Sequence, residues 1–452
     1  MARLMVLFFI GLLFSGSLFA QTDPTDIDGV DNIITTVYVS NTPIKLSYDQ
    51  AVQEGLHNNL SLVAAKYNIP MAEADELTAG LWNNPSLLAD TIFEPFGHNW
   101  NQTTAGGPRQ FDFGLSYPLD VSGAIPAAHK SAHEETNITK LTFQDTMRQT
   151  LLSIRLAYIN VMVAQQQLAL CEEVEDSLTD LIKVIKNRIG ETSRLPLEVL
   201  RAQLGLDQAK LNRRQAAVTL RAARTALAVA LGRHQETPIE TTTALRDFKM
   251  SPPPPVDSLI AQALESRPDL QALKATLKKA NLDKNLARAQ IWSGVVVTGQ
   301  YSTQGPVSAD PNDPTSHSIP RGNSWDASIT VPLPLFNHNQ GNIHKADLTM
   351  EQIKKQIESL QLTISQQIAG DYDQLVLNRG LVIDYEQGQL DNARKVRDEN
   401  QKQVGMGNDT LVDYFDALNA YVQIVSAYYN AVGAYRSSVA QIDADCAREV
   451  LP

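Results

Sequence analysis

The chain has 452 residues, of which 43% are hydrophobic and 19% charged, and its formal net charge is −12. No more than two Lys or Arg residues are consecutive, so the chain lacks the basic surface with which nucleic-acid-binding proteins neutralise phosphates. The length allows two or three ordinary domains or one elongated one.

The N-terminus reads MARLMVLFFIGLLFSGSLFAQTDP, with one basic residue, about eleven apolar residues, and then small and polar ones. Such a segment has the length of a secretory signal rather than of a membrane-spanning helix. We expect residues 1–20 to be a signal peptide cleaved near Ala20. Because no Cys lies near that point, we expect no lipid attachment there. No other apolar run approaches about 18 residues, so we expect no membrane-spanning helix in the mature chain.

The sequence repeats itself once, with an offset that drifts only from about 208 to 215 residues. Trp82, Pro118, His129 and Gly190 recur in the same order as Trp292, Pro332, His344 and Gly405. We therefore predict two structural repeats at 46–232 and 257–449. The linker between them, 233–256, contains SPPPP, which excludes a helix.

The first repeat is predicted to begin with a helix at about 47–82 and to continue with strands at about 87–95 and 110–118. A very long helix follows at about 124–189, and a shorter one at about 197–231. From Ala127 to Ile189 there is no Gly or Pro over about 63 residues, which as a helix would span roughly 95 Å. Apolar residues spaced by three and four, such as Ile154, Tyr158 and Val161, are typical of helices packed side by side.

The second repeat is predicted to follow the same plan, with strands at about 293–302 and 325–333 and a long helix at about 342–404. The strands alternate: Phe111, Phe113 and Leu115 share one face, while Asp112 and Gly114 share the other. Each strand has about nine or ten residues, the length of a tilted strand that crosses a bilayer core. Trp residues near the strand ends fit either an aromatic girdle or simple core packing. A coiled-coil rod would explain the helices but not these strands.

Four strands cannot close a barrel, and an open sheet edge in lipid costs several kcal/mol for each unpaired backbone group. If these strands lie in a membrane, the chain must oligomerise. Eight strands from a dimer would enclose only side chains, whereas twelve strands from a trimer begin to leave a lumen.

Two junctions carry a family resemblance. The stretch VPLPLFNHNQGNIHKA resembles the strand-to-helix junction of the TolC-type outer-membrane efflux family, and WNNPSL resembles its first helix-to-strand junction. The likeness covers about 46–449, and NRIGETSRLPLEVLRAQ is nearest to the cation-efflux, CzcC-like branch. The resemblance implies an α+β fold with two structural repeats. Four membrane β-strands per protomer would join a trimeric 12-stranded barrel that is continuous with a long α-helical barrel in the periplasm.

The resemblance also implies a function. The homotrimer would be the outer-membrane exit duct of a tripartite efflux system, with outer-membrane lipid around it. It would receive substrates from an inner-membrane pump of RND type through a periplasmic adaptor protein. The cargo would be heavy-metal cations or small toxic compounds. A duct for type I protein secretion and a periplasmic coiled-coil scaffold without a pore remain the alternatives.

Particular residues can be given roles on this basis. Pro118, Pro332 and Pro334 would end the β-ladder, because proline donates no backbone hydrogen bond. Gly123 and Gly341 would then let the chain turn from barrel to tunnel. By resemblance, the periplasmic helix tips would meet the adaptor. The residues carried over are Gly190, Glu191, Ser193, Gly405, Met406, Thr410 and Leu411, although the second tip is about two residues longer than the family pattern.

Asp409, Asp413 and Asp416 are candidate gate carboxylates at the second tip, but an ordinary solvated helix face explains them as well. The sequence has no phosphate-binding loop, no nucleophile elbow and no zinc-type Cys/His cluster. We therefore expect no enzyme activity and no cofactor.

His129 and His133 are four residues apart and share a helix face. This spacing fits either a metal-binding pair or two solvent-exposed side chains on the surface. Without a third ligand we expect no metal site. Cys171 and Cys446 would lie roughly 28 and 61 Å along helices from the two tips. A disulfide needs Cα atoms within about 7 Å, so we expect both thiols to be free.

Overall fold

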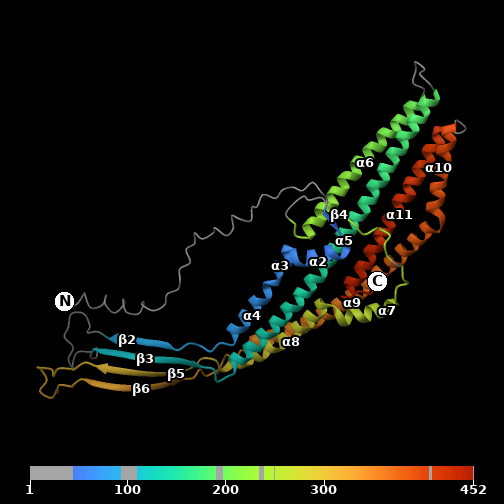
Figure 1. Ribbon diagram of the computed structural model, residues 1–452. Helices are drawn as coiled ribbons and strands as arrows, with labels where there is room; N and C mark the ends of the chain where they lie inside the picture. Colours follow the sequence, from blue (N-terminus) through green and yellow to red (C-terminus); the bar gives the residue numbers. More distant parts are fainter. Residues whose placement is uncertain are drawn as a thin grey trace, which may run out of the picture. The chain divides into compact units, whose positions relative to one another are not determined.

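The computed structural model describes residues 44–92, 109–189, 197–233, 239–248, 250–406 and 410–450. The expected signal peptide lies outside these residues. Two runs of helices and strands follow one another (Figure 1). The first run contains α2 (Tyr48–Asn58), α3 (Leu60–Lys66), α4 (Asn68–Ala79), β2 (Ser86–Ile92), β3 (Gln110–Leu119), α5 (Ala124–Ile189) and α6 (Leu197–Ala230). The second contains α7 (Val256–Ser266), α8 (Pro268–Ala289), the short 3₁₀ helix η1 (Gln290–Trp292), β5 (Val295–Gln304), β6 (Gly322–Thr330), α9 (Gln340–Asp384), the π-helical segment η2 (Tyr385–Gln389), α10 (Leu390–Met406) and α11 (Leu411–Asp445).

The 66-residue helix α5 is the longest element and packs along α6, α8 and α11. Its apolar residues at spacings of three and four are buried, with Ile154, Tyr158 and Val161 each 0% exposed. The Tyr158 hydroxyl donates a hydrogen bond to the Leu46 carbonyl at 2.9 Å, so its polar end is satisfied inside the core.

The helix predicted at 47–82 is in fact three helices, which corrects that prediction. Asn59 has extended backbone angles (φ −62°, ψ 112°) and caps α3, because its side chain accepts from the Leu62 N–H at 3.0 Å. The same side chain donates to the Ala230 carbonyl at 2.9 Å. Gly232, with φ +73°, approaches so closely that a Cβ there would lie 2.0 Å from the Asn58 carbonyl oxygen. This long-range contact breaks the helix, and no local pattern in the sequence predicts it.

The long helix predicted at 342–404 is also interrupted. α9 runs for 45 residues, and then η2 breaks the regular ladder. Within η2, Gly388 has φ +124°, a conformation that side chains other than glycine rarely adopt. The helix resumes as α10 on the far side.

The second repeat also opens with two helices rather than one. Arg267 is extended (ψ 124°) and Pro268 occupies the first turn of α8, where its missing N–H is tolerated. The segment expected to be a plain linker contains β4 (Ile239–Thr241), which forms a two-stranded sheet with β1 (Ile44–Leu46).

The four longer strands form one antiparallel sheet in the order β2-β3-β5-β6 (Figure 1). Its central pairing joins β3 of the first repeat to β5 of the second, for instance Phe113 opposite Tyr301. α5 and α9 begin shortly after β3 and β6 and lead away from the sheet. The two repeats therefore share one sheet, and each contributes one edge strand.

Candidate channel wall and helix tips

One face of the sheet is apolar and exposed. The register aligns Ala89, Phe113, Tyr301 and Trp325 across the four strands. Trp325 is 82% exposed, and its ring lies 4.9 Å from that of Tyr301. The neighbouring residues Leu87, Leu115 and Ile329 are 72%, 58% and 68% exposed. Large apolar side chains that cover a sheet face without burial mark a surface that contacts something other than water.

The opposite face of the sheet is polar. Asp112 and Ser302 are paired there and are only 7% and 3% exposed. Gln110 Nε2 donates to both carboxylate oxygens of Asp112 at 2.9 Å, and Ser302 Oγ donates to Asp326 Oδ2 at 3.3 Å. The register also sets Asp90 opposite Asp112. The apolar face of this sheet is the exposed one, whereas a sheet that packs on a hydrophobic core buries its apolar face and exposes its polar face.

The sheet has two edges that carry no neighbouring strand within the described part of the chain, at β2 and β6. None of the four strands contains Lys or Arg, the residues that usually protect an exposed edge from pairing with another chain. Each edge therefore presents a row of backbone groups suited to pair with a further strand.

The first junction from strand to helix is built around Asp120. The backbone N–H groups of Ala124 and Ile125 donate to its two carboxylate oxygens at 2.9 and 2.8 Å, and Ser122 Oγ donates to it at 3.0 Å. Gly123 has φ +71° and turns the chain into α5. Pro118 lies opposite Val296, two residues beyond the end of the ladder with β2, and β3 continues to Leu119. β3 is thus one residue longer than predicted.

The second junction differs from the prediction. β6 ends at Thr330, before Pro332 and Pro334. The left-handed residue is Asn339 (φ +57°), whose side chain donates to the Ala287 carbonyl at 2.7 Å. Gly341 is already the second residue of α9 and does not make the turn. Asn tolerates this conformation better than most residues.

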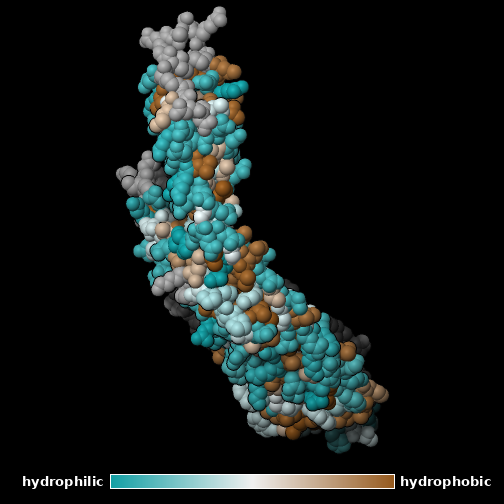
Figure 2. Space-filling model, turned by 90° about the vertical axis from the view of Figure 1, so that its right-hand side faces the viewer, coloured by the Kyte–Doolittle hydropathy of each residue, from teal (hydrophilic) through white to brown (hydrophobic). Residues whose placement is uncertain are grey.

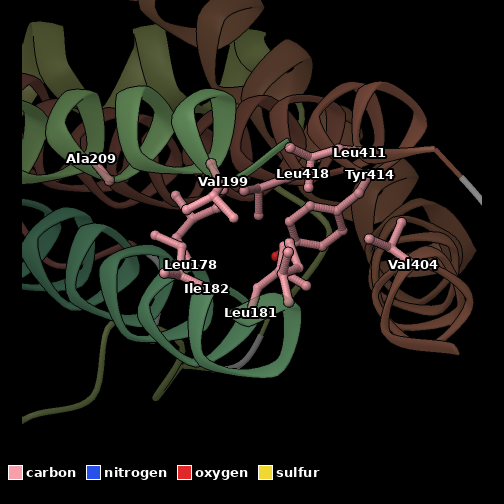
Figure 3. Packing of buried hydrophobic residues seen from close by; sticks show 11 residues of the cluster. Leu178, Leu181, Ile182, Val199, Ala209, Val404, Leu411, Tyr414 and Leu418 are labelled. Carbon is pink, nitrogen blue, oxygen red and sulfur yellow. The ribbon is translucent and has the colours of Figure 1, made fainter. Parts of the chain in front are cut away.

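At the opposite ends of the long helices, side chains from α5, α6, α10 and α11 converge on one buried cluster (Figure 3). Tyr414 lies at its centre, is 0% exposed, and shares a hydrogen bond of 2.9 Å with Ser177 Oγ. Burial raises the pKa of Tyr414. The cluster contains Leu178, Leu181, Ile182, Ile185, Val199, Ala202, Ala209, Val404, Leu411, Tyr414 and Leu418.

The predicted adaptor-contact residues have different environments. Gly190, Glu191 and Ser193 lie outside the described residues. Gly405 and Met406 end α10, and Met406 is 69% exposed. Thr410 is the N-cap of α11 and accepts from the Asp413 N–H at 3.3 Å.

Leu411 is only 6% exposed and belongs to the buried cluster, so its side chain supports the tip from inside rather than lying on its surface. Among the candidate gate carboxylates, Asp409 lies outside the described residues. Asp413 also accepts from the Thr410 hydroxyl and thus helps to cap α11, whereas Asp416 is exposed.

An ion-pair cluster between the helices was not predicted. Arg397 on α10 contacts Glu173 on α5 at 2.5 Å, and its guanidinium lies 4.0 Å from the ring centre of Tyr421 on α11. The Tyr421 hydroxyl donates to Glu173 at 3.1 Å. Burial lowers the pKa of Arg397, but its hydrogen bonds to Glu173 and Asp398 outweigh burial and raise it. Residues more than 200 positions apart give no local pattern from which this cluster could have been found.

The two histidines four residues apart share a carboxylate on α4. His133 Nδ1 lies 2.7 Å from Glu76 Oε1, while His129 Nε2 is 3.9 Å away. Hydrogen bonds from Thr136 and His133 lower the pKa of Glu76. Among the described residues, no three His, Cys, Asp or Glu side chains are placed to hold a metal ion.

Cys171 and Cys446 are both free thiols, and burial raises the pKa of Cys446 to about 11. Over the described ranges, no helix is both long and apolar enough to cross a membrane.

Comparison with known proteins decides the family. The model of the family described as "Outer membrane efflux protein" matches residues 51–233 and 259–444. The chain belongs to this family. It is therefore an outer-membrane protein of the TolC-like type, as the two junction motifs predicted.

Three relatives resemble this outer membrane efflux protein along much of its length. The probable outer membrane lipoprotein SilC of Salmonella typhimurium is 24% identical over 68% of this chain, and the match spans only 64% of SilC. The cobalt-zinc-cadmium resistance protein CzcC of Cupriavidus metallidurans is 20% identical, with 84% of each chain covered. The pyoverdine export outer membrane protein OpmQ of Pseudomonas aeruginosa is 24% identical over 80% of this chain and 77% of its own length.

Solved structures support the fold. The crystal structure of CusC superposes with a TM-score of 0.68 at 19% identity and covers 88% of this chain and 91% of its own. The outer membrane channel CmeC of Campylobacter jejuni gives 0.69 at 14% identity, with 89% and 86% covered. The predicted α+β fold with long helices is thereby confirmed.

Proposed function

We propose that three copies of this protein form a passive exit duct of a tripartite efflux system in the outer membrane. The observation that carries the proposal is the sheet, with its exposed apolar face and its two unpaired edges. Pairing each β2 edge with the β6 edge of the next copy would satisfy the backbone groups, as lipid requires. Twelve strands joined in this way would form a barrel with the apolar face toward lipid and the polar face toward a lumen.

The helices support assembly as well. Leu197, Leu204, Leu211 and Val218 on α6 are 63%, 73%, 56% and 62% exposed. All four residues are spaced by seven, the repeat of a helix that packs against another helix. Figure 2 shows hydrophobic residues interrupting a largely hydrophilic helical surface. In the proposed trimer, the helices of neighbouring copies would cover the exposed Leu and Val side chains of α6. The helices together would continue the barrel as a tunnel.

The polar face of the sheet favours cations as cargo. Asp90, Asp112 and Asp326 lie on it, and the four strands contain no basic residue. Repeated in three copies, these carboxylates would create a negative potential in the lumen and concentrate cations there. CzcC is named a cobalt-zinc-cadmium resistance protein, and the relative CusC of Escherichia coli is named a "Cation efflux system protein". Both names fit this charge, whereas the name of OpmQ concerns pyoverdine. We propose heavy-metal cations as the first cargo to test.

The same proposal assigns partners. A periplasmic adaptor would contact the helix tips, including Met406, and an inner-membrane pump of RND type would supply cargo and energy. A duct needs no catalytic group, so we propose that the protein is not an enzyme. If the pump of a type I secretion system binds in its place, the duct serves protein export instead.

Conductance in planar lipid bilayers tests the proposal. The purified protein should give stepwise currents that select cations, and Asp112→Asn combined with Asp326→Asn should shift the reversal potential in a KCl gradient toward zero. A protein that needs detergent but forms no pore in the bilayer would contradict the proposal. A protein that stays soluble without detergent and conducts nothing is the periplasmic scaffold.

A further inference from the structure

The break between α9 and α10 has the geometry of a hinge. In η2, Gln387 (φ −75°, ψ 22°) and Gly388 (φ +124°, ψ −12°) leave the helical region, and regular helix lies on both sides. A Cβ at Gly388 would have no atom closer than 3.9 Å, so neighbouring side chains do not fix this residue. π-helical breaks inside long helices frequently mark functional sites, and glycine absorbs large backbone rotations.

Three side chains hold this segment in place. The Arg246 guanidinium binds Glu386 of η2 through two bonds, from Nε at 2.5 Å and Nη2 at 3.0 Å. The Tyr428 hydroxyl of α11 donates to Glu386 Oε1 at 3.0 Å. Both carboxylate oxygens are thus occupied. The hydrogen bonds from Arg246 lower the pKa of Glu386, and burial together with the Glu386 contact raises the pKa of Tyr428 to about 12.

Arg246 itself projects from an anchored segment. Its Nη1 donates to the Phe248 carbonyl at 3.0 Å, and its guanidinium lies 4.7 Å from the centre of the Phe248 ring. The Phe248 ring packs on Tyr435 of α11 at 5.2 Å, and Leu245 is buried. Arg436 of α11 donates to the Leu245 carbonyl at 3.2 Å. The segment that follows β4 is therefore fixed to α11 and reaches across to η2.

There is free space beside these contacts. A cavity of about 160 Å³ is lined by Leu245, Arg246, Tyr428 and Tyr429. Tyr385 of η2 contacts the Tyr428 ring edge-on, with ring centres 6.3 Å apart. A side chain released from Glu386 would thus have room to change position without unpacking the core.

We propose that Arg246, Glu386 and Tyr428 form a clasp that fixes the angle between α9 and α10 at Gly388. Release of the clasp frees the angle at Gly388, so that α10, which stays packed on α5 and α11 through Arg397 and Val404, shifts with its tip relative to α9 and widens the inner end of the duct. The clasp connects the segment between the two repeats, through η2, to α10 and the tip at the end of α10. This inference rests on the proposed function, because the tip has a gating role only in a duct.

Two variants that each remove one charge test the clasp in planar bilayers. Glu386→Gln keeps the shape of the side chain, and Arg246→Gln replaces the guanidinium with a shorter neutral amide. Each should raise the mean conductance of the channel roughly threefold to tenfold, as expected for loss of a charge-assisted bidentate pair. The double variant should exceed neither single variant. The exchange Arg246→Glu with Glu386→Arg should bring conductance back toward that of the natural protein.

Arg213→Gln is the matched control. Arg213 is 41% exposed and pairs with Glu175 at 2.6 Å, much as Arg246 is 40% exposed and pairs with Glu386. That pair joins α5 to α6, away from the hinge, and its loss should leave conductance unchanged. Equal conductance of the natural protein and both clasp variants would refute the clasp.

Hydrogen exchange separates failure of the clasp from failure of the proposed function. In Glu386→Gln, amides of 390–406 should exchange faster than in the natural protein, while those of α5 should not change. If the natural protein forms no pore, the proposed function fails, yet this exchange result still supports the clasp. Unchanged exchange in 390–406 contradicts the clasp whether or not a pore forms.

Discussion

At the scale of single residues, several glycines are required because two helices approach too closely for a side chain. A Cβ on Gly433 of α11 would lie 2.4 Å from Val163 Cγ2 on α5, and one on Gly205 of α6 would lie 2.6 Å from Phe415 Cε1 on α11. Gly370 of α9 is different, because no atom lies within 4 Å of the corresponding Cβ position. These contacts bring helices from the two repeats together.

Gly433→Ala should therefore lower the free energy of unfolding by about 1–3 kcal/mol, the usual cost of forcing a methyl group into a packed core. Gly370→Ala, also within a helix, should be neutral or stabilising by up to about 1 kcal/mol. Thermal unfolding of the two variants in the same detergent measures both effects. Equal midpoints for the two variants would show that the close packing of α5 and α11 is wrong.

A second residue-scale prediction concerns Asp445, which is 0% exposed near the end of α11. Gln367 Nε2 donates to its Oδ1 at 2.8 Å, and Arg267 Nη1 lies 3.7 Å away. Burial, followed by the nearby carboxylate of Asp371, raises the pKa of Asp445 to about 7 from an ordinary 3.8. The folded protein then keeps a proton that the unfolded chain releases, so stability falls as pH rises from about 4 to about 7.

Asp445→Asn removes this titration. The difference in melting temperature between the variant and the natural protein should move in favour of the variant from pH 5 to pH 8. Ionisable groups that do not interact with Asp445 are the same in both proteins and cancel in that difference. A difference that stays constant over this pH range would contradict the raised pKa.

At the scale of elements, the sequence predicted those helices and strand faces that are determined by local residue patterns. The absence of Gly and Pro predicts α5, and alternation predicts which face of β3 carries Phe111, Phe113 and Leu115. The breaks at Asn59 and Gly388 could not be predicted, because a distant backbone contact in one case and a single glycine in an otherwise helical pattern in the other decide them. The sequence predicts the left-handed turn at Gly341 rather than at Asn339, because glycine is the usual left-handed residue, but Asn also adopts that conformation.

The exposed face of the sheet gives an element-scale prediction through Trp325. In a variant whose other three Trp residues are Phe, emission from Trp325 should be quenched strongly by lipids with brominated acyl chains. Acrylamide in the aqueous phase should quench it weakly, because the apolar face should contact lipid. The opposite order of quenching would place this face in water.

At the scale of the whole molecule, the internal repeat and its junction motifs were enough to predict the fold, but they did not predict the contacts between distant helices. The shared junction motifs predicted the TolC-like fold because they reflect the change from strand to helix. The clusters at Arg397 and Arg246 escaped prediction, since their partners come from distant helices. The adaptor contact of the candidate tip residues stays a prediction: Leu411 is buried, Met406 is exposed, and Gly190 lies outside the described residues.

The central claim is that the edges of β2 and β6 pair between copies to close a ring of three. In a chain with Cys171→Ala and Cys446→Ala, the substitutions Ala89→Cys on β2 and Ala327→Cys on β6 place one thiol on each edge strand. A bis-maleimide too short to span the roughly 14 Å between the two edge strands of one chain, applied to the protein in liposomes, should give covalent species that end at the trimer on a denaturing gel, and each single cysteine should give none. Products that end at the dimer, or a chain that stays monomeric although both thiols react, would contradict the account.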